Sequence, residues 1–131
     1  MVAGAVAGQP DAVAGLMLIT PWNRLVEPAQ FHYPWLPVGW ILQDRYDNSR
    51  NLAQFGRPVL VAVAERDSIV PARFGTALYE TLAGPKQLRV IPKADHNDWF
   101  FRVDGAWWQD SIGFLLTPPA TAQSPQDGQQ P

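Results

Sequence analysis

An aspartate and a histidine in this chain have the residue types and the settings that acid–base chemistry requires. Asp67 lies in AERDSIVP, directly after the apolar run PVLVAVA, and His96 lies in PKADHND, directly after the run QLRVI. If both runs are parallel strands of one open sheet, the two residues lie on loops that leave the carboxyl ends of strands, where such sheets bind ligands. The sequence therefore predicts that Asp67 and His96 lie on the same rim of a sheet.

A carboxylate beside an imidazole is the orienting half of a hydrolytic triad. The acid accepts a hydrogen bond from one ring nitrogen and stabilises the imidazolium that forms when the other nitrogen takes a proton from a nucleophile. Each residue also has a simpler interpretation, Asp67 as a turn-forming residue and His96 as a histidine satisfied within its loop. Asp95 and Asp98 could also partner His96, but neighbours in sequence rarely reach a ring with good geometry, so we interpret them as turn or helix-cap residues.

The hydrophobic pattern predicts an α/β fold with about three parallel strands and flanking helices. Apolar runs of strand length occupy residues 14–20, 58–64 and 87–91. The second run is β-branched and lacks polar alternation, as expected of a parallel strand that is covered on both faces.

Three helices are predicted around these strands. Small residues at 3–8 suit a tightly packed first helix, and residues 71–84 form a second, which Gly84 and Pro85 end. One face of this second helix carries apolar residues at every fourth position, namely Phe74, Leu78 and Leu82. Strand, helix and strand together make a right-handed βαβ unit. A last helix is expected at 105–116. One side of this helix would carry Trp108, Ile112 and Leu115 or Leu116.

Residues 21–57 are predicted to be a cap or lid-like segment between the first two strands. The segment has four prolines, eight aromatic or histidine rings and no single period, and its length is more typical of a cap with short helices than of a plain loop. Its aromatic residues could line an apolar acyl or alcohol pocket, or they could equally form the core of the cap. The candidate substrate-binding residues are Trp22, Phe31, Tyr33, Trp35 and Trp40.

The segments around Asp67 and His96 resemble the last third of an α/β-hydrolase of the serine esterase and lipase superfamily. The matching stretches are PVLVAVAERDSIVP, ARFGTALYETL and KADHND, and AGLMLITP is similar to the strand that follows the nucleophile helix in that family. The resemblance covers residues 1–116 as a partial α/β-hydrolase domain, with residues 21–57 in the place of the family's cap. It implies that Asp67 is the triad acid and that His96 is the triad histidine.

The sequence lacks the nucleophile motif of that family. The family's serine lies in G-x-S-x-G, on a sharp turn between a strand and a helix, and no G-x-S-x-G occurs in the 131 residues. MVAGAVAG looks like the helix that follows such a turn, so we expect a serine shortly upstream of Met1 in a truncated or mis-started product, and an inactive chain without it. Ser49, Ser68 and Ser111 are the substitute nucleophiles, but none lies in a glycine-flanked turn.

Composition and charge argue against several other functions. A net charge of −2 with scattered Lys and Arg provides no basic stripe for nucleic acid, and the lack of Cys excludes disulfides and thiolate chemistry. His32 has no second ligand at metal-binding spacing, so neither a metal nor a cofactor is expected.

The apolar start lacks a basic segment and is interrupted by Gln9, Pro10 and Asp11, so no membrane segment is predicted and a cytoplasmic location is the default. The Pro- and Gln-rich residues 117–131 predict a disordered tail.

Two further classes of protein remain open. A non-catalytic remnant could pair the open edge of its sheet with a partner chain. An in-frame G-x-S-x-G in the DNA shortly upstream of Met1 would favour a mis-started enzyme, and a stop codon there would favour the remnant. A flavodoxin-like nucleotide binder would need a Gly-rich strand-to-helix turn, which we do not find. The expected partners are therefore a small-molecule ester or acyl substrate and a chain at the open sheet edge.

Overall fold

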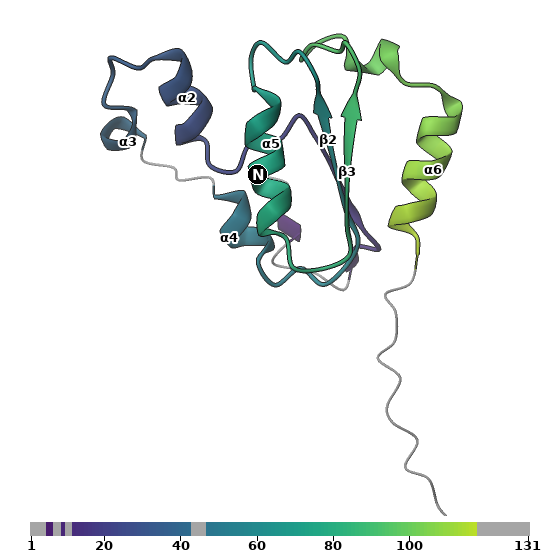
Figure 1. The fold of residues 1–131 in the computed structure, drawn as a ribbon. Helices are drawn as coiled ribbons and strands as arrows, with labels where there is room; N and C mark the ends of the chain where they lie inside the picture. Colours follow the sequence, from purple (N-terminus) through teal and green to yellow (C-terminus); the bar gives the residue numbers. More distant parts are fainter. Residues whose placement is uncertain (1–4, 7–8, 10–11, 43–46, 118–131) are drawn as a thin grey trace, which may run out of the picture.

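The structure is a computed structural model that describes residues 5–6, 9, 12–42 and 47–117. Within these residues, parallel strands form one sheet in the order β1-β2-β3 (Figure 1). The strands are β1 Leu16–Ile19, β2 Val59–Ala64 and β3 Lys86–Ile91. In the register of the sheet, Val59 of the central strand pairs with Leu16 on one side and with Lys86 on the other. The three predicted strands are therefore confirmed, with small differences at their ends.

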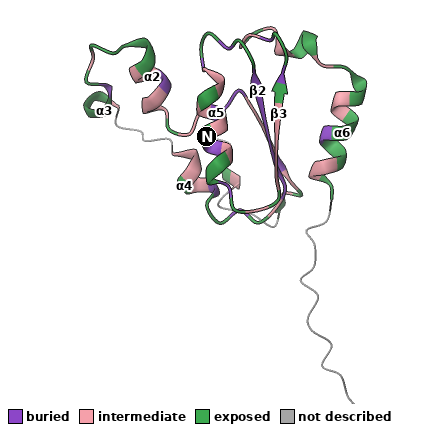
Figure 2. Ribbon diagram, viewed as in Figure 1, coloured by how far each residue is buried: buried purple, intermediate pink, exposed green. Residues whose placement is uncertain are grey.

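The central strand β2 is buried on both faces because its side chains alternate between two hydrophobic clusters. Val59, Val61 and Val63 face the cluster that includes helix α4 Asn48–Leu52 and helix α5 Ala72–Thr81. Leu60, Ala62 and Ala64 face the other cluster, against the 3₁₀ helix η2 Trp99–Arg102 and helix α6 Gly105–Leu115. Figure 2 shows that β2 is buried along its length.

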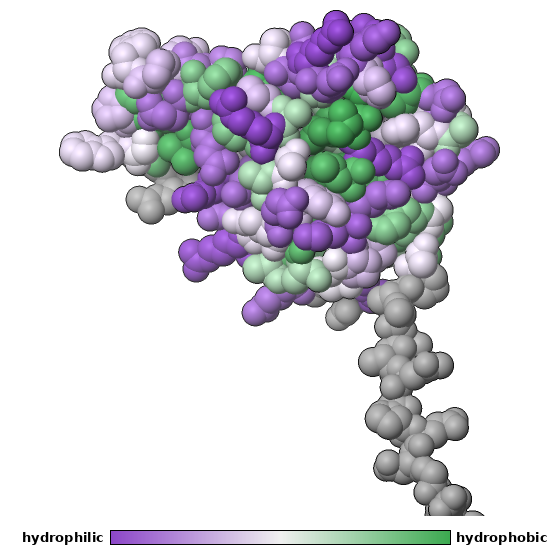
Figure 3. Space-filling view, in the orientation of Figure 1, coloured by the Kyte–Doolittle hydropathy of each residue, from purple (hydrophilic) through white to green (hydrophobic). Residues whose placement is uncertain are grey.

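The outer strand β3 is covered less completely than β2. Most of its residues are only partly buried, and Val90 is 54 % exposed. Figure 3 shows hydrophobic side chains at the surface over the strands between α5 and α6. The weaker hydrophobic pattern of residues 87–91 therefore reflects a strand at the edge of the described sheet.

Helix α5 packs closely on β2, and one glycine permits this contact. Gly75 is buried, and a Cβ atom on it would lie 2.5 Å from Cγ1 of Val63. Leu78 and Leu82 of the predicted apolar face are buried, as expected, while Phe74 lies at the start of the helix against Phe31. The predicted βαβ unit of β2, α5 and β3 is thus confirmed.

The apolar residues that the sequence places on one side of the last helix are not all buried. Ile112 is 48 % exposed and Leu116 is 64 % exposed, and the residues that pack on the sheet cluster are Trp107, Phe114 and Leu115. Ser111 is fully buried on this side, where its hydroxyl donates to the Trp107 carbonyl at 2.6 Å. Because Ser111 interrupts the row of apolar residues on this side of the helix, the hydrophobic pattern alone pointed to a neighbouring side.

Residues 21–57 contain short helices, as predicted for a cap. Besides α4 these are α2 Val26–His32 and α3 Val38–Ile41, and residues 43–46 lie outside the described residues. The cap function of the segment stays a prediction.

The predicted disordered tail, apart from Thr117, and most of the predicted helix at residues 3–8 also lie outside the described residues. Across the part of the chain that is described, no helix is long and apolar enough to cross a membrane.

Candidate active site

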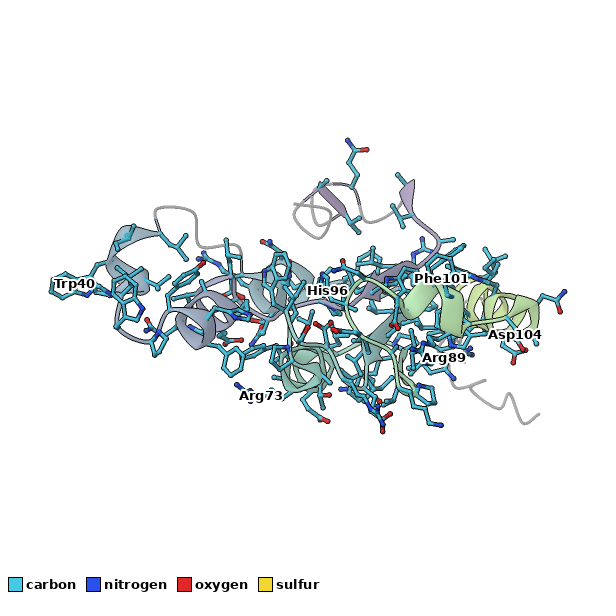
Figure 4. All side chains as sticks on the ribbon, turned by 90° about the horizontal axis from the view of Figure 1, so that it is seen from above. Trp40, Arg73, Arg89, His96, Phe101 and Asp104 are labelled. Atoms are coloured by element: carbon cyan, nitrogen blue, oxygen red, sulfur yellow. The ribbon has the colours of Figure 1, made fainter. Side chains whose placement is uncertain are left out.

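The loops that carry Asp67 and His96 lie side by side because they extend the pairing of β2 and β3. The Glu65 amide donates to the Ile91 carbonyl at 3.1 Å, and the Arg66 amide donates to the Ala94 carbonyl at 2.8 Å. Both loops leave the carboxyl ends of their strands, which is the rim that Figure 4 views from above, with His96 near its centre. The topology thus brings together two residues that are distant in sequence.

Asp67 is held in one orientation by its own loop. Its side chain is 1 % exposed, and its Oδ1 accepts hydrogen bonds from the backbone amides of Ile69 at 3.0 Å and Val70 at 2.6 Å. An aspartate that bonds the amides two and three residues ahead closes a local turn and satisfies its own charge there. The turn-forming interpretation of Asp67 is therefore correct, and it is compatible with a second role.

His96 bonds to this carboxylate through one ring nitrogen. Nδ1 lies 2.9 Å from Oδ2 of Asp67 and 3.1 Å from its Oδ1. An ionised carboxylate can only accept, so Nδ1 carries the hydrogen and Nε2 of the neutral ring is the basic nitrogen. The His96 side chain is 25 % exposed. Within the described residues no hydrogen bond is assigned to Nε2, which is therefore the nitrogen available to a reacting group.

A left-handed residue at the end of β3 turns the chain towards Asp67. Lys93 has φ 58°, a backbone conformation that non-glycine residues rarely adopt. Its amide donates to the Glu65 carboxylate at 2.6 Å, and the following Ala94 is fully buried. The turn and the buried alanine set where the histidine loop begins.

Asp95 and Asp98 do not bond the His96 ring; they shape the loops instead. Hydrogen bonds from the backbone amides of Ser68 and His96, and then from the Ser68 hydroxyl, hold the pKa of Asp95 below its ordinary value. The Arg102 side chain and the Asp95 amide hold the pKa of Asp98 below its ordinary value. They were predicted to be turn or helix-cap residues: both accept from amides of their own loop, neither caps η2 through its side chain, and the bonds between Asp95 and the Asp67 loop were not anticipated.

The three serines considered as substitute nucleophiles direct their hydroxyls elsewhere. Ser49 donates to Asp47 at 2.6 Å, Ser68 donates to Asp95 at 2.9 Å, and Ser111 is buried against the Trp107 carbonyl. None of these assigned bonds involves the His96 ring. The structure therefore pairs none of the three hydroxyls with the His96 imidazole, the base that the triad would use to activate a serine.

Most of the aromatic residues predicted to bind substrate lie at the surface of the described structure. Four of them are exposed, from 46 % for Phe31 and 53 % for Tyr33 to 75 % for Trp35 and 93 % for Trp40, which lies at the tip of α3 in Figure 4. Trp22 is partly exposed, and its indole Nε1 is buried without a hydrogen-bond partner among the described residues. The four exposed residues therefore do not form a buried core, and the role of all five in binding stays a prediction.

His32 makes a contact that the sequence did not suggest. Its Nε2 lies 2.6 Å from the Ile69 carbonyl oxygen, so the end of α2 is bonded to the loop that carries Asp67. Beside it the Arg73 guanidinium lies 4.7 Å from the centre of the Phe31 ring. No group of three or more His, Cys, Asp or Glu side chains is placed to hold a metal ion within the described ranges. His32 therefore joins the 21–57 segment to the candidate site.

The curated relatives of the chain are longer proteins. No protein-family model matches the chain. The uncharacterized protein Rv2307c of Mycobacterium tuberculosis is 38 % identical over 107 residues, which are 82 % of this chain and 38 % of that protein. A lysophosphatidylserine lipase of Danio rerio is 33 % identical over an alignment of 92 positions, and the match covers 60 % of this chain and 23 % of the lipase. The chain thus spans well under half the length of these relatives.

Solved structures share the fold. Rv0554 of Mycobacterium tuberculosis matches with a TM-score of 0.65 and 17 % identity, over 87 % of this chain and 60 % of that one. BpoC of the same organism, which bears the name of a non-heme bromoperoxidase, matches with a TM-score of 0.61 and 17 % identity, over 87 % of this chain and 62 % of that one. The esterase domain of a Rhodothermus marinus protein matches with a TM-score of 0.55 and 20 % identity, over 81 % of this chain and 55 % of the domain.

These matches and the parallel sheet define the class of the protein. The chain has part of an α/β-hydrolase fold, as the resemblance of its motifs implied. Three parallel strands with helices on both faces make up the described part of this fold.

Proposed function

We propose that Asp67 and His96 are the acid and the general base of a serine-hydrolase site that cleaves an ester or related acyl bond. The observation that carries this proposal is the 2.9 Å hydrogen bond between His96 Nδ1 and a carboxylate that is itself buried and held by two amides. This arrangement selects the ring tautomer in which Nε2 is basic. The shared fold and the resemblance of the surrounding motifs support the assignment.

In this proposal His96 moves protons and Asp67 remains ionised. His96 Nε2 accepts the hydroxyl proton of a serine as the serine oxygen attacks the acyl carbon, and the imidazolium then gives that proton to the leaving alcohol. In the second half of the reaction, a water molecule gives a proton to His96 Nε2 and attacks the acyl carbon, the acyl–serine bond breaks, and the imidazolium returns the proton to the serine oxygen as the acid leaves. Asp67 stabilises the imidazolium in both halves and keeps the ring in place.

The substrate class is proposed from two comparisons and from the exposed aromatic segment. One relative is named a lysophosphatidylserine lipase, and one matched structure is an esterase domain. The aromatic side chains of residues 21–57 would supply apolar contacts for an acyl chain or an alcohol, because small-molecule sites are mostly hydrophobic. We therefore propose an ester with an apolar portion.

The proposed site also needs a nucleophile and oxyanion donors, which we do not assign to any of these 131 residues, so a hybrid protein provides the test. In this hybrid, the matching residues of the present chain replace the 107-residue segment of Rv2307c. We expect no hydrolysis of p-nitrophenyl esters by the 131-residue chain. We expect hydrolysis, and labelling of a serine by a fluorophosphonate, in the hybrid and in its Rv2307c parent.

Two outcomes would contradict the proposed function. Ester turnover by the 131-residue chain that survives His96→Ala would show that the roles are assigned wrongly. A folded hybrid that remains unlabelled, while its parent is labelled, would show that this chain does not supply the acid and the base.

A second candidate is a non-catalytic module that binds a partner strand. The observation that favours it is that β1 is paired through β2 on one side only among the described residues. Extended segments of other proteins can add to such an edge through backbone hydrogen bonds. The DNA upstream of Met1 separates the candidates, since an in-frame G-x-S-x-G favours the hydrolase and a stop codon favours the module.

A further inference from the structure

One carboxylate connects the loop of Asp67 to the loop of His96. Oδ1 of Asp95 accepts from the Ser68 amide at 2.8 Å and from the Ser68 hydroxyl at 2.9 Å. The same oxygen accepts from the His96 amide at 2.7 Å, and Oδ2 also accepts from the Ser68 hydroxyl at 3.0 Å. Asp95 therefore bonds to both loops near their tips.

The donors of these bonds directly adjoin the candidate catalytic pair. Ser68 follows Asp67 in the sequence, and His96 contributes its own amide. A single carboxylate oxygen thus lies within hydrogen-bond distance of the backbone beside the acid and of the backbone of the base. A change in its position would alter the separation of the two side chains that meet at 2.9 Å.

Asp95 is itself held by a chain of charged groups. Its amide donates to Oδ1 of Asp98 at 2.6 Å, and Oδ2 of Asp98 accepts from Arg102 at 2.7 Å. The bonds that lower the pKa of Asp95 favour its charged form, and hydrogen bonds to an ionised acceptor are the stronger kind. The helical turn η2, which contains Arg102, thus supports the loop that supports the histidine.

We infer that Asp95 is a positioning residue that sets the distance and the angle between Asp67 and His96 by bonding both of their loops. The inference rests on the proposed function of that pair. Asp95 does not touch the His96 ring and would act on the reaction only through the placement of the acid and the base. Small misplacements of catalytic groups can reduce a rate by about 10²-fold.

The first test reads the tautomer of His96 by NMR and requires no catalysis. Histidine-specific ¹⁵N labelling of the full 131-residue chain gives two imidazoles, and His32→Gln assigns them. At a pH where the rings are neutral, we expect His96 to carry its proton on Nδ1, because Asp67 accepts from that atom, and His32 to carry its proton on Nε2, because the Ile69 carbonyl accepts from that atom.

Substitution of Asp95 should reduce the preference of His96 for one tautomer and leave the tautomer of His32 unchanged. In Asp95→Ala we expect His96 to become a mixture of tautomers while the remaining backbone spectrum keeps its dispersion. Asp95→Asn keeps an acceptor oxygen without the charge, and we expect an intermediate mixture. Asp110→Asn makes the same change of charge on the exposed side of α6 and should leave His96 unchanged.

The second test measures kinetics in the hybrid with Rv2307c. We expect Asp95→Ala to lower kcat by about 10- to 100-fold with little change in KM, because placement of the catalytic groups affects the chemical step. Asp110→Asn should keep the kcat of the unmodified hybrid. A residue that only closes a turn would lower stability and leave both the tautomer and kcat as they are.

The two tests separate the inference from the proposed function. If His96→Ala leaves the hybrid fully active, the proposed function is wrong, and the tautomer of His96 still decides whether Asp95 positions the ring. If Asp95→Ala, or Asp95→Asn where the alanine variant does not fold, keeps the Nδ1 tautomer as completely as Asp110→Asn, the inference is overturned.

Discussion

At the scale of the residue, Asp67 combines two tasks in one side chain. Its Oδ1 closes the turn to Ile69 and Val70, and its Oδ2 makes the shorter bond to His96. Because the amides hold the carboxylate, the imidazole meets an acceptor that is already oriented, which is how a preorganised site limits the entropy lost on reaction. Asp95 holds the backbone of both loops through the Ser68 and His96 amides, without contact to the ring itself.

The lowered pKa values near the site predict a loss of stability in acid. For Asp95 and Asp98, hydrogen bonds favour the charged form, so their pKa values in the folded chain lie below the unfolded value of about 3.9. Such groups stabilise the fold above the unfolded pKa, and this contribution is lost as the pH falls through the folded pKa. We expect the thermal unfolding midpoint to decrease as the pH falls from 6 towards about 3.

Asp95→Asn should reduce this dependence on pH, because the amide does not titrate. Circular dichroism melts of the chain and of Asp95→Asn between these pH values would measure the two slopes. Equal slopes would mean that Asp95 contributes nothing to the acid sensitivity of the fold.

The predicted meeting of Asp67 and His96 succeeded because it depended on topology. Two apolar runs followed by polar loops, with a helix between them, place both loops on one rim in any right-handed βαβ unit. The role of Asp95 could not be predicted in this way. Whether a carboxylate bonds its own ring, its own turn or a neighbouring loop depends on backbone angles such as the φ of Lys93, which hydrophobic patterns do not encode.

At the scale of the element, α5 is the helix that fixes the loop of Asp67 to the sheet. It begins immediately after that loop, and its buried Gly75 lies against Val63 of β2. The spacing of its apolar residues predicted this helix well. The spacing of apolar residues in α6 could not predict which of its faces is exposed, because the burial of Ser111 depends on the hydrogen bond from its hydroxyl to the Trp107 carbonyl.

A glycine pair tests the packing of α5. Gly75→Ala should destabilise the chain by about 1–3 kcal/mol, because the new methyl group would overlap a stiff valine side chain, Val63, and would force the helix away from β2. Gly113 in α6 has open space at the Cβ position, so Gly113→Ala should stabilise by about 0.5–1 kcal/mol through helix propensity. Urea unfolding measures both, and destabilisation of similar size in the two variants would contradict the assigned packing.

The 21–57 segment was predicted less completely than the sheet. Its short helices and its irregular character were expected, because prolines and rings without a period do not form a long helix. The distribution of its aromatic side chains could not be predicted, since neither composition nor spacing says whether a tryptophan packs inward. The exposure of Trp35 and Trp40 is consequently a result of the structure alone.

At the scale of the whole molecule, the chain spans only part of the length of the proteins that it matches. The chain covers about 60 % of the matched structure Rv0554 and 38 % of the relative Rv2307c. Its strand β1 has an edge that pairs with no other strand among the described residues. The resemblance to α/β-hydrolases implies that a further strand would pair with this edge.

Hydrogen exchange tests the state of that edge. Leu16 and Thr20 donate their amides to Pro58 and Ala62 on the β2 side, and amides alternate along a strand, so those of Met17 and Ile19 face the open side. We expect these two amides to exchange faster than the Leu18 amide in the 131-residue chain and to become protected in the hybrid. Slow exchange of all three amides in the chain itself would show that the edge is already covered.

The measurement that tests the central claim most directly is ester hydrolysis by the hybrid with and without its histidine. His96→Ala removes the proposed general base, and a positioned base contributes about 10²- to 10⁴-fold to the rate. We predict that His96→Ala lowers kcat at least about 10²-fold, with serine labelling by the fluorophosphonate lost in parallel, and that Asp110→Asn changes neither. A folded His96→Ala hybrid that hydrolyses the ester at the unmodified rate would contradict the assignment of Asp67 and His96 as the acid and base of a hydrolase.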